Sequence, residues 1–212
     1  MTRKRVAVLI SGRGSNMSAL LEAASAPTYP AEIVLVVSNR PDAAGLPVAA
    51  ERGIRTAVVD HKEFSTKSEF EAALEAEFRA AAADIVCLAG FMRLLTPGFV
   101  ERWRNRILNI HPSLLPEFPG LDTHARALAA GARHHGATVH FVRAETDSGP
   151  IVAQSALNVR PDDTAESLAA RVLALEHRLY PEALRMVASG EVTVEDGRAV
   201  SASRIRPPFD RS

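Results

Sequence analysis

Short apolar runs rich in β-branched residues alternate with longer stretches of helical pattern along the first half of the chain. The predicted strands are residues 5–10, 32–37, 55–59, 84–89 and 106–110, and the helical stretches between them are 16–24, 43–52, 67–83 and 97–103. Continuous apolar strands separated by helices are typical of a parallel sheet with helices on both faces. This alternation predicts an α/β fold built on a mostly parallel, twisted sheet.

The pattern changes at Gly136. Two strand-like runs, 136–142 and 151–159, follow one another without a helix between them, which predicts an antiparallel extension at the edge of the sheet. A long amphipathic stretch from 164 to 188 follows, opened by the capping signal Asp-Asp-Thr. We therefore expect a long helix that packs across the sheet.

The last segment, residues 191–201, has a hairpin pattern with Asp196-Gly197 at its turn. We expect the tail that carries Pro207 and Pro208 to be loose. At 212 residues, with 47% hydrophobic side chains, the chain can bury one sizeable core. A single domain with a short appendage is therefore expected.

The charge balance points to a small-molecule partner, because 25 Lys and Arg residues match 25 Asp and Glu residues. Such a chain has no global basic field for nucleic acid or an anionic membrane. The first apolar run is too short for a signal peptide, and no segment approaches the length of a membrane span. The single cysteine, Cys87, excludes an internal disulfide and lies in a predicted buried strand, so inert core packing and a reducing cytoplasm are expected.

A glycine-rich loop, residues 11–16, connects the first predicted strand to a helix. Backbone N–H groups and the positive end of the helix would converge there, which suits an anion. The loop lacks the Gly-Lys-Ser/Thr of a Walker motif, and Met17 stands where a dinucleotide fingerprint needs a third glycine. We expect a site for one phosphate monoester, with backbone donors from Gly14, Ser15 and Asn16; an ordinary glycine-rich turn is the alternative.

An Asn-x-His pair ends the fifth predicted strand. Because side chains alternate along a strand, Asn109 and His111 should share one face at its carboxyl end, where open α/β sheets bind ligands. An amide can donate to a developing oxyanion while an imidazole moves a proton, so the pair suits attack on a carbonyl without a covalent nucleophile. The alternative is that both residues only satisfy a strand end.

Asp147 lies in the connection between the two late strands and reads equally well as a turn former. A carboxylate near His111 would orient the imidazole and favour its charged form, but the residues alone do not show that the two meet. The adjacent His134 and His135 are predicted to lie on the surface. The histidine spacings are not those of zinc sites, so no catalytic metal is expected.

Five motifs in order resemble those of the phosphoribosylglycinamide formyltransferases, the folate-dependent transformylase family of purine synthesis. The motifs are SGRGSN at 11–16, LAGFMRLL at 88–95, LNIHPSLLPEFPG at 108–120, HGATVHFV at 135–142 and DSGPIV at 147–152. The match covers about residues 5–190. The resemblance implies a formyltransferase fold, 10-formyltetrahydrofolate as co-substrate with no tightly bound cofactor, and glycinamide ribonucleotide as acceptor.

The resemblance also implies roles for particular residues. The implied catalytic residues are Asn109, His111 and Asp147; the nucleotide would be bound by Gly14, Ser15, Asn16 and Glu176, and the folate by Lys67, Met92, Arg93, Leu94, Leu95 and Asn109. A strand end with core packing is the alternative for residues 92–95. The implied organisation is a nucleotide-binding half (1–110), a folate-binding and catalytic half (111–190), and a hairpin and tail (191–212).

The chain departs from the family pattern at three positions. Lys67 stands where related enzymes often carry arginine, which weakens the expectation of a bidentate folate contact. Ser148 replaces a glycine that is common after the catalytic aspartate, and Arg13 lies in the phosphate loop where neutral residues occur. None of the three is one of the implied catalytic residues.

Three rival functions remain open. A hydrolase that releases formate from the same folate would use the same residues but usually carries an N-terminal regulatory domain, for which we expect no room here. A methionyl-tRNA formyltransferase should add a basic C-terminal domain. A non-catalytic phosphate-binding module would keep the fold without turnover. The expected assembly is a monomer or a homodimer.

Overall fold

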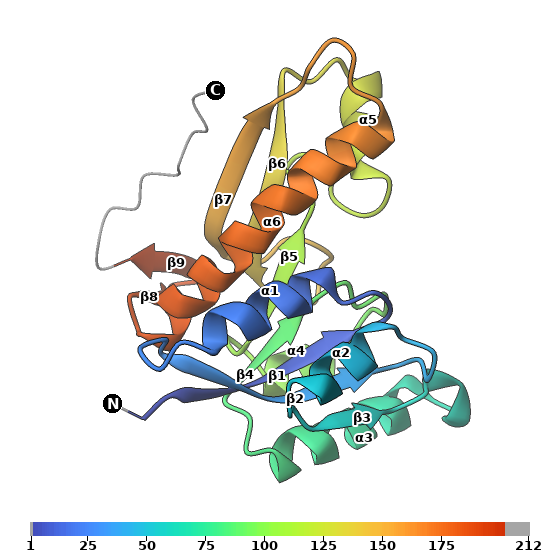
Figure 1. Ribbon diagram of the computed structural model, residues 1–212, viewed down its shortest axis with the longest axis vertical. Helices are drawn as coiled ribbons and strands as arrows, with labels where there is room; N and C mark the ends of the chain where they lie inside the picture. Colours follow the sequence, from blue (N-terminus) through green and yellow to red (C-terminus); the bar gives the residue numbers. More distant parts are fainter. Residues whose placement is uncertain (1, 202–212) are drawn as a thin grey trace. The chain divides into compact units, whose positions relative to one another are not determined.

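The computed structural model describes residues 2–201, so the tail with Pro207 and Pro208 lies outside the described part of the chain. A seven-stranded sheet has the strand order β3-β2-β1-β4-β5-β6-β7, and β8 and β9 form a separate two-stranded hairpin (Figure 1). The predicted fold class, a mostly parallel sheet with an antiparallel C-terminal extension, is confirmed. The chain divides into two compact units, Met1–Asn109 and Ile110–Ser212.

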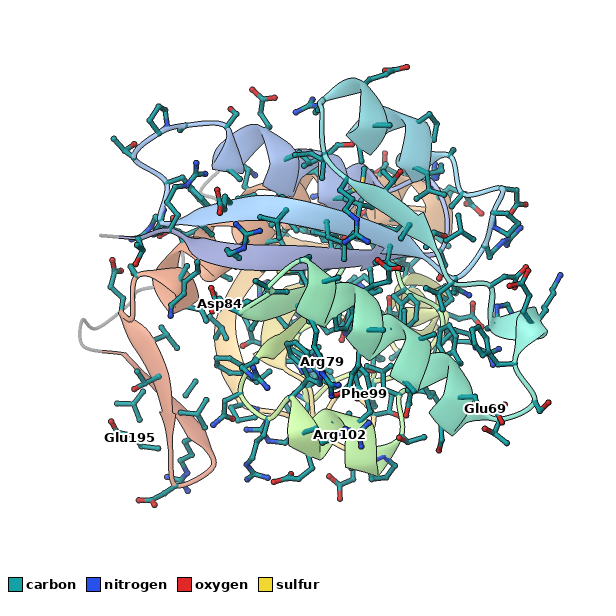
Figure 2. All side chains as sticks on the ribbon, turned by 90° about the horizontal axis from the view of Figure 1, so that it is seen from below. Glu69, Arg79, Asp84, Phe99, Arg102 and Glu195 are labelled. Atoms are coloured by element: carbon teal, nitrogen blue, oxygen red, sulfur yellow. The ribbon has the colours of Figure 1, made fainter. Side chains whose placement is uncertain are left out.

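The first unit contains the parallel strands and their connecting helices. Its elements are β1 (Lys4–Ile10), α1 (Ser15–Ala24), β2 (Ala31–Ser38), α2 (Gly45–Glu51), β3 (Thr56–Val58), the 3-10 turn η1 (His61–Glu63), α3 (Lys67–Ala80), β4 (Ile85–Leu88), α4 (Pro97–Arg102) and most of β5 (Ile107–His111). Helices α1 and α2 cover one face of these strands, and α3 and α4 cover the other (Figures 1 and 2). Because both faces are covered, residues 6–10 of β1 have no exposed surface.

Strand β1 is the centre of this unit, pairing in parallel with β2 on one side and with β4 on the other. The chain runs from β1 outward to β2 and β3, and then returns to β4 across β1. The order of the strands therefore reverses at the carboxyl ends of β1 and β4. Open α/β sheets bind ligands at such a switch point.

A buried carboxylate, Glu75, joins α3 to α4. Its Oε1 accepts hydrogen bonds from the indole N–H of Trp103 at 3.0 Å and from Nε of Arg102 at 3.2 Å. The guanidinium of Arg79 lies 3.7 Å from the other oxygen of the same carboxylate. Burial raises the pKa of Glu75, but the donors from Arg102 and Trp103 outweigh it and hold that pKa below its usual range. The charged carboxylate is thus stabilised where two helices meet.

The second unit contains the antiparallel strands and the long helix. Its remaining elements are α5 (Thr123–Ala129), β6 (His134–Phe141), β7 (Ile151–Asn158), α6 (Ala165–Ala188), β8 (Val192–Glu195) and β9 (Arg198–Ser201). Strands β6 and β7 are antiparallel, and α6 packs on both (Figure 1). Helix α6 starts with a capping box between Thr164 and Ser167, as the capping signal predicted. Among residues 2–201, no helix has the length and apolar character that a membrane span requires.

Candidate active site

The glycine-rich loop leads from β1 into the first turn of α1. Gly14 is the N-cap and has a left-handed backbone with φ 71°. A Cβ at this position would lie 3.1 Å from the Cα of Gly45 and from the Cε of Met17, so glycine also permits the close approach of α2. Ser15 and Asn16 are the first two residues of the helix, at the positive end of its dipole. The loop thus has the form of an anion site.

The segment after β4 presents apolar side chains at the surface. The side chains of Met92 and Leu94 are 65% and 68% exposed, whereas Leu95 is half-buried. Core packing is therefore excluded for Met92 and Leu94. Arg93 and Lys67, the first residue of α3, are also exposed. Exposed apolar side chains on both sides of Arg93 in the chain suit a ligand that combines rings with carboxylates.

A cavity of about 330 Å³ lies at the carboxyl ends of β1, β2 and β4. It is lined by Ser11, Gly12, Asn39, Arg40, His61, Gly90, Met92 and Arg93. Sequence reasoning predicted two of these residues, Met92 and Arg93, as site residues, and placed Ser11 and Gly12 in the phosphate loop. It assigned no role to Asn39 or His61, which lie 22 positions apart and meet only in the fold.

His111 and Asp147 meet in the second unit. The Nδ1 of His111 lies 3.4 Å from the Oδ2 of Asp147, and both side chains are more than 90% buried. The Nε2 of His111 lies 3.0 Å from the carbonyl oxygen of Phe118, and the N–H of Gly120 donates to the Oδ2 of Asp147 at 2.8 Å. Both ring nitrogens of His111 thus face oxygen atoms, which fix the orientation of the ring.

Two backbone features bring the turn that carries Asp147 against β6. Asp147 itself has a left-handed backbone with φ 54°. A Cβ at Gly149 would lie 1.7 Å from the carbonyl oxygen of Phe141, so only glycine allows this approach. The turn would be displaced by any larger residue at 149.

A second histidine, His140, approaches Asp147 from β6. Its Nε2 lies 3.7 Å from the Oδ1 of Asp147, and the side chain is 2% exposed. Burial lowers the pKa of His140, although the carbonyl of Phe141 and the charge of Asp147 oppose this shift. The two oxygens of Asp147 therefore face different histidines. The sequence placed His140 in a strand but gave no sign of this contact.

The predicted surface location is wrong for His135. His134 is exposed at the start of β6, but His135 is 1% exposed, because neighbouring side chains of a strand point to opposite faces. Its Nε2 lies 3.2 Å from the Nδ1 of His124. Burial, with a smaller contribution from His124 and His111, lowers the pKa of His135 to about 4. Among residues 2–201, no group of three potential metal-ligating side chains is placed to hold an ion.

The other predicted residues lie on regular elements. Asn109 is half-buried in β5, two positions before His111 in the same strand. Glu176 lies in α6 and is 7% exposed. Cys87 has no exposed surface within β4, which confirms its predicted core location. The structure thus pairs His111 with Asp147 and places Asn109 on the strand that leads to them.

Comparison with known proteins identifies the family. A model of the formyl transferase family matches residues 4–184. The chain is 40% identical to a phosphoribosylglycinamide formyltransferase from Haemophilus influenzae, over 96% of each sequence. It is also 50% identical over 190 residues to the trifunctional purine biosynthetic protein adenosine-3 of Gallus gallus, of which it spans only 19%.

Solved structures agree with this result. A glycinamide ribonucleotide transformylase from Symbiobacterium toebii has a TM-score of 0.91 and 43% identity, with 95% of both chains covered. A formyltetrahydrofolate deformylase from Burkholderia mallei has a TM-score of 0.86 and 30% identity, covering 95% of this chain and 71% of that one. The chain belongs to the formyl transferase family. It is a formyltransferase enzyme, and its predicted resemblance to the phosphoribosylglycinamide formyltransferases is confirmed.

Proposed function

We propose that this enzyme transfers the formyl group of 10-formyltetrahydrofolate to the amine of glycinamide ribonucleotide in purine synthesis. The observation that carries the proposal is the buried pair of His111 and Asp147, in a chain that matches phosphoribosylglycinamide formyltransferases over nearly its whole length. The 40% and 43% identities to the two transferases, against 30% to the deformylase, favour an amine over water as acceptor.

In this mechanism the substrate amine attacks the formyl carbon, and the carbonyl oxygen gains negative charge. Asn109 donates a hydrogen bond to that oxygen. The attacking nitrogen then loses a proton, while the bond between the formyl carbon and folate N10 breaks. His111, oriented by Asp147, takes up the proton that the attacking nitrogen loses and passes it to N10, so that tetrahydrofolate leaves as a neutral amine.

Binding of the two substrates is assigned to separate groups of residues. The nucleotide phosphate would bind the backbone N–H groups of Gly14, Ser15 and Asn16 at the start of α1, where the helix dipole favours an anion. The folate would lie on Lys67, Met92, Arg93, Leu94, Leu95 and Asn109, and Glu176 would approach the glycinamide portion. The phosphate loop belongs to residues 1–110 and the proton-transfer pair to 111–190, the two halves expected from the sequence.

The test is the consumption of 10-formyltetrahydrofolate, followed by absorbance with and without glycinamide ribonucleotide. Consumption that requires the nucleotide supports the transferase. Equal consumption without it would indicate a hydrolase, and binding of both compounds without turnover would indicate a non-catalytic module. The same assay tests the role of His111, because His111→Ala should slow nucleotide-dependent consumption. Its matched control is His134→Ala, which removes an exposed histidine of the same unit and should leave the rate unchanged.

A further inference from the structure

The peptide N–H of Met92 is held by a side chain rather than by the sheet. At the end of the ladder between β1 and β4, the N–H of Ala89 donates to the carbonyl of Leu9 at 2.9 Å, and the N–H of Ser11 donates to the carbonyl of Gly90 at 3.2 Å. Beyond Gly90 the chain leaves the sheet, and the Met92 N–H donates to Oγ of Ser11 at 2.8 Å. Ser11 is 8% exposed, so water competes poorly for this bond.

The hydroxyl of Ser11 is itself fixed by Asn39, which is 2% exposed. It donates to the Oδ1 of Asn39 at 2.6 Å, which leaves its lone pairs for the Met92 N–H. The Nδ1 of His61 lies 3.1 Å from the amide nitrogen of Asn39 and 3.0 Å from its backbone oxygen. The imidazole therefore holds Asn39 in either neutral tautomer, by accepting from the amide or by donating to the carbonyl.

The other end of the segment is held in the same way. The N–H of Thr96 donates to the carboxylate of Glu71, a residue of α3 that is 2% exposed. The backbone around residues 92–95 is thus held at both ends by buried side chains, Ser11 at Met92 and Glu71 at Thr96. Within this segment the side chains of Met92 and Leu94 are exposed.

We propose that Ser11 is a positioning residue for folate binding, acting through the Met92 N–H without touching the substrate. The inference rests on the proposed function, in which the folate lies against residues 92–95. Ser11 also belongs to the loop that would hold the nucleotide phosphate at Gly14. One loop therefore binds one substrate directly and positions the binding segment for the other.

The test compares Ser11→Ala with Ser11→Thr, which keeps the hydroxyl. An unpaired buried N–H lets the segment shift, so Ser11→Ala should raise the KM for 10-formyltetrahydrofolate about tenfold. The kcat and the KM for the nucleotide should stay within about twofold, because the chemistry and the phosphate donors are unchanged. Ser11→Thr should restore the folate KM, and the Kd for tetrahydrofolate should follow the same pattern.

Ser38→Ala is the matched control. Ser38 has no exposed surface, and its Oγ accepts from the N–H of Arg40 at 3.0 Å, so its loss removes the same kind of bond beside Asn39. Its folate KM should not change. An unchanged folate KM in Ser11→Ala, or an equal rise in Ser38→Ala, would overturn the inference. If the wild-type enzyme transfers no formyl group to the nucleotide, the proposed function fails, and tetrahydrofolate binding still tests the role of Ser11.

Discussion

Replacing Gly149 by alanine tests whether the position of Asp147 depends on the close approach of two backbone segments. A Cβ at residue 149 lies 1.7 Å from the carbonyl oxygen of Phe141, so the segments would have to separate by about 1.7 Å to restore an ordinary contact of 3.4 Å. That movement breaks the 2.9 Å hydrogen bond from the Phe141 N–H to the carbonyl of Pro150. It also lengthens the 3.4 Å contact between His111 and Asp147.

The expected effect is large on both rate and stability. A misplacement of about 1 Å in a reacting group costs on the order of 10²-fold in rate, so kcat should fall about 100-fold. The broken hydrogen bond and the steric strain should lower the free energy of unfolding by about 2–4 kcal/mol, which lowers Tm by about 5–15 °C. Formyl transfer at saturating substrates and urea unfolding measure the two quantities.

Gly98→Ala is the control for Gly149→Ala. In α4, a Cβ at residue 98 would lie 3.6 Å from a guanidinium nitrogen of Arg102, an ordinary contact. This variant should keep full activity and gain about 0.4–1 kcal/mol of stability from the reduced freedom of the unfolded chain. Near-normal kcat and an unchanged urea midpoint in Gly149→Ala would refute the reasoning.

We expect Asn109→Ala and His111→Ala each to lower kcat about 10²–10⁴-fold at saturating substrates, and near-normal rates in both would remove them from the mechanism. The pKa of His135 is about 4 in the folded protein against 6.5 as its ordinary value, so the unfolded chain binds more protons between these pH values. The free energy of unfolding should therefore fall by up to about 3 kcal/mol as the pH drops through this window, and urea titrations of His135→Gln should show a flatter dependence. A slope identical to that of the wild type would contradict the buried neutral histidine. Glu75→Leu leaves the indole N–H of Trp103 without its acceptor, so urea unfolding should show a loss of about 1–3 kcal/mol, and no loss would exclude a stabilising role for this carboxylate.

The regular elements were predictable because their signals are local. The apolar run at residues 5–10 and the capping signal at 164 are read within a few positions, and both mark elements of the structure. The antiparallel pairing of β6 with β7 was predictable for the same reason, because two strands with no helix between them are most simply joined as an antiparallel pair. Helix α5 was not predicted, although α2 and α4, which are no longer than α5, were.

The contacts of the site were harder to predict from the sequence, because they depend on distances between segments that are far apart in the chain. Asp147 reads as a turn residue, and its approach to His111 depends on the missing side chain of Gly149 and on a register shift between β6 and β7 at His140. His135 was assigned to the surface together with its neighbour, although a strand sends adjacent side chains to opposite faces. Asp147 was predicted as a site residue from the family resemblance, whereas the approach of His140 to Asp147 is seen only in the structure.

Because the cysteine of β4 is buried, a thiol-reactive label on the folded protein can be directed to a cysteine introduced elsewhere. Cys87 is the single cysteine in the sequence and has no exposed surface, between strands that pair with β4 on both sides. A thiol reagent should modify it only when the sheet opens, so its reactivity reports on unfolding. A second thiol introduced at Leu94, which is 68% exposed, should react in the folded protein and carry a dye that reports on residues 92–95 alone.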